Sequence, residues 1–194
     1  MKKWHKIALL LVVIIGVLVA VKSCIDKKEA DITMAYIGDD FVDFPAFEIG
    51  REALAALCDD INNDGEVWID MTEISFSDQL GQGDRQNSFQ KLTSAVGMGT
   101  ARVYILEEKY VISNVSSGVF ADLSHLGEGF VSPDGKTVAI SVEGNKTVES
   151  LGIKASEDMY IAVREVSEMD TVTDKNIQNK HTAAMSIAEY IINN

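Results

Sequence analysis

Residues 53–76, ALAALCDDINNDGEVWIDMTEISF, predict a helix that is followed by a buried strand. The helix is expected over residues 47–61. Its apolar residues recur at the spacing of one buried helix face: Leu54, Leu57, Cys58 and Ile61. The Asn and Gly residues of 62–65 end the helix. The strand, expected over 67–76, begins with apolar residues on both faces, as strands inside a parallel sheet do.

The same alternation of strand and helix continues along the chain. Further apolar runs predict strands at 32–38, 101–106, 136–142 and 159–166. Further helices are expected at 89–96, at 109–117 and from 174 to the end. Residues 41–46, which include Pro45, are expected to form a loop. Strands that alternate with helices indicate an α/β fold, with a mostly parallel sheet flanked by helices.

A membrane-targeting segment opens the chain. Three lysines precede an apolar run at residues 7–21. As a helix this run is about 22 Å long at ~1.5 Å per residue, which suits the hydrophobic region of a signal peptide. Residues 21–24, Val-Lys-Ser-Cys, resemble the bacterial lipobox, and this resemblance makes Cys24 a lipidated N-terminal residue. An uncleaved, N-terminal hydrophobic anchor helix is the alternative.

Both alternatives tether the protein to the cell membrane through residues 1–25. The N-terminal lysines favour a cytoplasmic location for that end, so residues 26–194 are expected to be extracytoplasmic. Residues 26–31 form a short charged tether. The remaining residues, 32–194, are numerous enough for one domain and too few for two of ordinary size.

The net charge of −13 is unevenly distributed. The first 23 residues carry four lysines and no acidic residue, so the rest of the chain has 13 basic and 30 acidic residues and a charge of −17. Such a surface repels phosphate backbones and anionic lipid headgroups. The composition therefore excludes nucleic acid as a partner and leaves solubility, cations or basic partners as uses of the charge.

Residues 60–71 match part of the calcium-loop template. Oxygen-bearing side chains stand at the first, third and fifth positions, and Gly65 supplies the sharp turn. Met71 stands at the twelfth position, where a bidentate Glu is expected, so Glu73 or a distant acid would have to complete the site. The candidate Ca²⁺ ligands are Asp60, Asn62, Asp64, Glu66 and Asp70. The alternative is a plain turn after a helix.

Motifs for catalysis fail when their spacing is checked. Ser88 and Lys91 fit the SxxK spacing of penicillin-interacting enzymes, but the KTG triad that accompanies it is missing from the sequence. The three histidines are far apart, and His181 falls on the apolar face of the last expected helix, where a partly buried, hydrogen-bonded histidine is expected. We therefore expect no enzymatic activity.

Several segments together resemble one family. They are ITMAYIG at 32–38, QNSFQKLTSAVGMGTARVYIL at 86–106, VFADLSHL at 119–126, MYIAVREV at 159–166 and AAMSIAEYIINN at 183–194. With the lipobox before them, they look like one lobe of the solute-binding lipoproteins that serve bacterial ABC importers. The likeness covers residues 32–123 and 159–192. It implies a single truncated lobe that binds a small solute, or an ABC permease or envelope protein, without catalysis.

Ligands of parallel sheets bind beyond the carboxyl ends of the strands. The polar residues expected there are Asp39, Asp40, Gln79, Asp84 and Arg85. They are the candidate ligand-binding residues. The alternative function is a calcium-stabilised structural or protein-interaction domain at the cell envelope.

Overall fold

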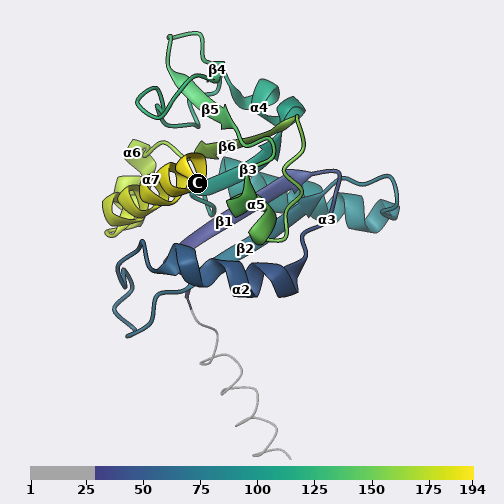
Figure 1. Ribbon diagram of the computed structural model, residues 1–194. Coiled ribbons are helices and arrows are strands. Elements are labelled where there is room, and N and C mark those ends of the chain that lie inside the picture. Colours follow the sequence, from purple (N-terminus) through teal and green to yellow (C-terminus); the bar gives the residue numbers. More distant parts are fainter. Residues whose placement is uncertain (1–28) are drawn as a thin grey trace, which may run out of the picture.

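A six-stranded sheet with helices on both faces forms the frame of the protein (Figure 1). The computed structural model describes residues 29–194. The strands are β1 (Ile32–Gly38), β2 (Ile69–Ser75), β3 (Val103–Glu107), β4 (Phe130–Val131), β5 (Thr137–Ser141) and β6 (Met159–Val163). They lie in the order β2-β1-β3-β6-β5-β4.

The strands do not all run the same way. β1 pairs in parallel with β2 and β3. β6 is antiparallel to β3, and β5 is antiparallel to β6, so β5 runs in the direction of β3. The two-residue strand β4 reverses direction again at the edge. The predicted α/β fold with a mostly parallel sheet flanked by helices is confirmed, but the sheet is mixed.

Helices cover both faces of the sheet. They are α2 (Phe44–Ala55), α3 (Gln82–Leu92), the π-helix η1 (Thr93–Gly97), α4 (Glu108–Asn114), α5 (Lys146–Ser150), α6 (Glu168–Thr173) and α7 (Ile177–Asn193). The residues of α2, α5 and α7 pack in one apolar cluster, and those of η1 and α4 pack in the other. Within residues 29–194, none of these helices has the length and apolar character needed to cross a membrane.

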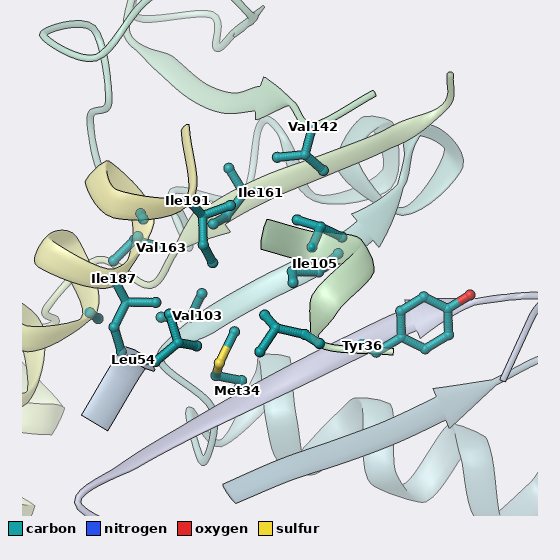
Figure 2. Packing of buried hydrophobic residues seen from close by; sticks show 14 of the residues in the cluster. Met34, Tyr36, Leu54, Val103, Ile105, Val142, Ile161, Val163, Ile187 and Ile191 are labelled. Carbon is teal, nitrogen blue, oxygen red and sulfur yellow. The ribbon is translucent and has the colours of Figure 1, made fainter. Parts of the chain in front are cut away.

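β1 shows how the sequence builds both halves of the core. Ile32, Met34 and Tyr36 contribute to one cluster, and Ala35 and Ile37 contribute to the other. This alternation follows from the two-residue period of a strand. Figure 2 shows the first of these layers, in which Met34 and Tyr36 lie with side chains of β3, β6 and α7. β1 is buried on both faces because strands flank it and helices cover it.

Helix α2 occupies a different range from the predicted one. It begins before Pro45 because Asp43 caps it, with Asp43 Oδ1 accepting a hydrogen bond from Ala46 N at 3.4 Å, and because proline is tolerated in the first helical turn. It ends at Ala55 instead of Ile61. Near Ile61 the backbone bonds to a distant side chain instead of continuing the helix, since Asp31 Oδ1 accepts from Ile61 N at 2.8 Å.

Candidate functional site

The carboxyl ends of β1 and β3 mark the point where the strand order reverses. The chain passes from β1 to β2 through α2 on one face, and from β2 to β3 through α3 and η1 on the other. In open α/β sheets this switch point is where ligands bind. Asp39, which follows β1, and Glu107, the last residue of β3, lie here together with Lys109.

An ion-pair network fills this switch point. Lys109 Nζ lies 2.5 Å from Asp39 Oδ2 and 2.8 Å from Glu107 Oε2. Glu107 Oε1 also accepts a hydrogen bond from Asp39 N at 2.6 Å. Burial lowers the pKa of Lys109, but hydrogen bonds to the two carboxylates raise it more, so the net shift of its pKa is upward. The charged groups of Lys109, Asp39 and Glu107 are therefore paired with one another.

Tyr36 closes the same region from within the sheet. Its hydroxyl oxygen accepts a hydrogen bond from Asp40 N at 3.2 Å, and Asp40 Oδ2 lies 3.7 Å from Lys154 Nζ. Burial first, and then the charge of Glu107, raise the pKa of Tyr36. Gly38 is required here because a β-carbon on it would lie against Tyr36 Oη and 2.7 Å from Glu107 Oε1. The switch point is thus closely packed.

An open groove lies beside it, along the free edge of β2. We call this feature the β2 groove; its volume is about 590 Å³. Its polar lining includes Thr72, Glu73, Asp84, Asn87, Ser88 and Lys91. Phe41, which is 49% exposed, adds an aromatic ring to the lining. The groove exists because β2 has a neighbouring strand on one side and α3 packs against it (Figure 1).

Two side chains of α3 hold the free edge of β2. Ser88 Oγ donates a hydrogen bond to the carbonyl oxygen of Ser75 at 2.6 Å, and Lys91 Nζ donates to that of Glu73 at 3.0 Å. Ser88 and Lys91, the SxxK pair, therefore bind carbonyl oxygens at the free edge of β2. Proteins commonly protect exposed edge strands by covering them in this way. His181 lies as expected, half-buried with Nδ1 3.2 Å from the carbonyl oxygen of Arg164.

The five predicted ligand residues divide into two groups. Asp39 and Asp40 belong to the switch point. Gln79, Asp84 and Arg85 belong to the β2–α3 connection and the start of α3, and of these Asp84 lines the β2 groove. Arg85 pairs with Asp78 at 2.9 Å.

The remaining polar residues of the groove were missed. Thr72 and Asn87 are examples, and their side chains belong to β2 and to α3. They could be recognised only with the knowledge that β2 lies at an edge of the sheet and that α3 packs against it.

The candidate calcium loop is a tight, internally bonded turn. Asp60 accepts hydrogen bonds from Asp64 N at 3.2 Å and Gly65 N at 2.8 Å. Asn62 Oδ1 accepts from Asp64 N at 2.9 Å. Asn63 and Gly65 have positive φ values of 60° and 94°, so the backbone folds back as the template requires. Oxygens of the first, third and fifth template positions thus lie in one turn.

The acids expected to complete a metal site lie elsewhere. Glu73 Oε2 accepts from Val42 N at 2.7 Å, at the other end of β2 from the loop. Asp70 is exposed on β2, and no group of three or more His, Cys, Asp or Glu residues within 29–194 is placed to hold a metal ion. The three loop residues Asp60, Asn62 and Asp64 could hold Ca²⁺ only with water completing its coordination, which makes a weak site.

Comparison with protein-family models, curated proteins and solved structures gave no match. The predicted anchor, residues 1–25, and the predicted lipidation site Cys24 lie outside the described residues. The geometry of residues 29–194 and the sequence are therefore what a functional proposal can rest on.

Proposed function

We propose that the protein is a membrane-tethered, extracytoplasmic binding protein that holds a polar solute without catalysis. The β2 groove is the observation that carries this proposal. Its volume of about 590 Å³ falls within the range of small-molecule sites. It is also open, whereas the donors and acceptors of the switch point are engaged with one another.

The lining of the groove favours a solute with many hydrogen-bonding groups. Thr72 and Asn87 offer a hydroxyl and an amide, and Asp84 offers a carboxylate. Phe41 offers a partly exposed apolar surface in the same groove. A short saccharide or peptide combines both properties, and an ABC permease or another envelope protein would receive it.

The groove is tested by thermal melting of the full-length chain in a neutral detergent with a panel of saccharides and short peptides. A bound solute at tenfold its Kd should raise the midpoint by about 3–6 °C, because a ligand stabilises the folded state that binds it. Asn87→Ala should weaken binding up to about tenfold through the loss of a hydrogen bond.

The matched control is Asn179→Ala, which also removes an exposed amide, but from α7 and outside the groove lining. It should keep the affinity of the wild type. A panel in which no solute raises the midpoint contradicts the proposal, and so does a solute whose affinity is unchanged by Asn87→Ala.

A calcium-stabilised structural or protein-interaction domain is the second candidate. It is favoured by the turn at residues 60–66, where the side-chain oxygens of Asp60, Asn62 and Asp64 lie together and Gly65 folds the chain back. The acidic part of the chain after residue 23, with a charge of −17, also attracts cations.

Calcium binding predicts a difference between two melting curves. About 5 mM calcium should raise the midpoint by about 2–4 °C over a chelator if Kd lies near ~10⁻³ M. Asp60→Ala should remove this difference, and Asp59→Ala, at an exposed neighbouring position outside the template, should preserve it. Identical curves for the wild type with calcium and with chelator rule out this candidate.

A further inference from the structure

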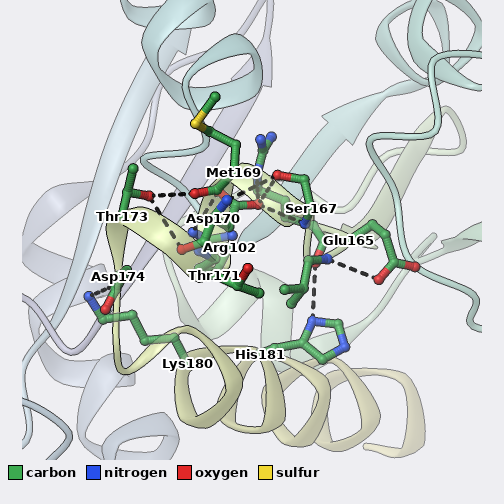
Figure 3. A network of polar contacts seen from close by, with 12 residues as sticks. Arg102, Glu165, Ser167, Met169, Asp170, Thr171, Thr173, Asp174, Lys180 and His181 are labelled. Carbon is green, nitrogen blue, oxygen red and sulfur yellow. Dashed lines mark hydrogen bonds and ion pairs between the residues drawn. The ribbon is translucent and has the colours of Figure 1, made fainter.

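Two buried arginines share one buried carboxylate beside the sheet (Figure 3). Arg102, Arg164 and Asp170 are 7%, 8% and 6% exposed. Arg102 Nη2 lies 3.5 Å from Asp170 Oδ1, and Arg164 Nε lies 3.7 Å from Asp170 Oδ2. Both distances are long for charge-assisted hydrogen bonds, which are usually about 2.7–2.9 Å. Asp170 therefore compensates the two guanidinium groups incompletely.

Asp170 is also engaged by its own helix. Asp170 Oδ2 accepts hydrogen bonds from Ser167 N at 3.0 Å and from Ser167 Oγ at 2.9 Å, in the capping box of α6. Arg164 has a second partner, because its Nη1 donates to the carbonyl oxygen of Val96 at 2.6 Å. Arg102 Nη1, like Arg164 Nε, is buried and has no hydrogen-bond partner in the described part of the chain.

A buried, incompletely paired guanidinium is costly. Removing such a charge from water costs several kcal/mol unless acceptors replace the lost water. Buried polar groups in native proteins nearly always have a partner, and an exception calls for an explanation such as a bound ion. Arg102 therefore has the capacity to bind an additional acceptor.

A pocket lies at this position, at the amino ends of β1 and β3. We call it the Arg102 pocket; its volume is about 280 Å³. Besides Arg102, its lining includes Thr33, Gly99, Thr100, Asp174 and Lys180. It shares Thr100 with the β2 groove, but Arg102 is not part of the groove lining.

Two of the three acids of the pocket, Asp174 and Asp31, already have partners. Asp174 pairs with Lys180 (Figure 3), and Asp174 Oδ2 lies 2.9 Å from Lys180 Nζ. Asp31 uses both carboxylate oxygens, accepting backbone hydrogen bonds from Ile61, Asn62 and Trp68. Glu29 adds a negative charge to the lining and limits the affinity for anions. Arg102 is thus the group in this pocket with an unused buried donor.

We propose that the Arg102 pocket binds a small oxyanion, a carboxylate or a phosphate, that accepts hydrogen bonds from Arg102. The planar fork of a guanidinium matches both groups, and the pocket is large enough for either. The threonine hydroxyls in the lining provide further donors. This site adjoins the proposed solute site, with which it shares Thr100, but the proposal does not depend on that site.

The test is thermal melting of the full-length chain in a neutral detergent with sodium phosphate, sodium acetate or sodium chloride at equal ionic strength. Phosphate or acetate at tenfold its Kd should raise the midpoint by about 3–6 °C above the chloride sample. Arg102→Met should abolish this difference. Lys146→Met, a control at an exposed cationic residue outside the pocket, should retain it.

Calorimetric titration provides a second measurement. Arg102→Gln keeps a neutral N–H donor, and its affinity for the anion should be at least about tenfold lower than that of the wild type, because the charge-assisted bond is lost. This variant also serves if Arg102→Met does not fold. Equal midpoints in the three salts, or equal affinities of the wild type and Arg102→Gln, overturn the proposal.

Discussion

Replacement of Asp31 with alanine is expected to lower the free energy of unfolding by about 3–5 kcal/mol. The side chain is fully buried. Its carboxylate accepts hydrogen bonds from Ile61 N at 2.8 Å, Asn62 N at 3.0 Å and Trp68 N at 2.7 Å. Alanine removes this acceptor from all three N–H groups at once. The connection between α2 and β2 would lose its attachment to the start of β1.

Urea denaturation at neutral pH measures this loss. The control is Asp59→Ala, which removes an exposed carboxylate from the same connection and should change stability by less than about 0.5 kcal/mol. Asp31→Asn should fall between the two, because an amide oxygen still accepts hydrogen bonds but carries no charge. A loss below about 1 kcal/mol for Asp31→Ala would show that the three contacts contribute little.

Replacement of Asp170 with alanine is the second change with a large expected effect. It leaves Arg102 and Arg164 buried without a carboxylate and removes the capping box that Asp170 forms with Ser167. Breaking a buried ion pair on one side costs about 3–5 kcal/mol. Glu168→Ala, at an exposed acid on the same helix, should change stability far less. Urea denaturation of both variants at pH 7 makes the comparison.

The contribution of Asp170 should depend on pH. Burial raises the pKa of Asp170, but the hydrogen bonds from Ser167 and the charges of Arg102 and Arg164 lower it more, so the pKa lies below the ordinary value of 3.8. A carboxylate with a depressed pKa stabilises the folded state at pH values above its ordinary pKa. This stabilisation is lost as the pH falls through the pKa that the group has in the folded state. The stability difference between wild type and Asp170→Asn should therefore be constant from pH 7 to 5 and shrink below about pH 4. A constant difference down to pH 3 contradicts this assignment.

Much of the fold could be predicted because its local signals agree with its tertiary structure. The apolar runs of β1 and β3 and the helical period of α7 are visible in the sequence. The end of α2 was predicted wrongly because it depends on Asp31, which is distant in the sequence. α6 was missed, although its capping box of Ser167 and Asp170 is a sequence signal for a helix start. The antiparallel direction of β6 could not be predicted, since a buried strand has the same apolar pattern in either direction.

The candidate site was predictable in part. Because ligands of parallel sheets bind beyond the carboxyl ends of the strands, Asp39 was predicted as a site residue, and it lies at the switch point. Its partners there, Glu107 and Lys109, are about seventy residues away, and no local pattern connects them to it. The unpaired donor of Arg102 could not be predicted, because it depends on how Asp170 lies against Arg102 in the folded protein, and no local sequence pattern reveals this contact.

The burial of Asp31 limits how far the domain could stand from the proposed membrane anchor. With the membrane anchor proposed for residues 1–25, five residues separate the bilayer surface from a side chain that is fixed in the fold. Five residues extend at most about 18 Å at ~3.6 Å each. The amino ends of β1 and β3, with the Arg102 pocket, would then stay near the lipid headgroups. The switch point lies at the other end of β1, about 23 Å away along the strand at ~3.3 Å per residue.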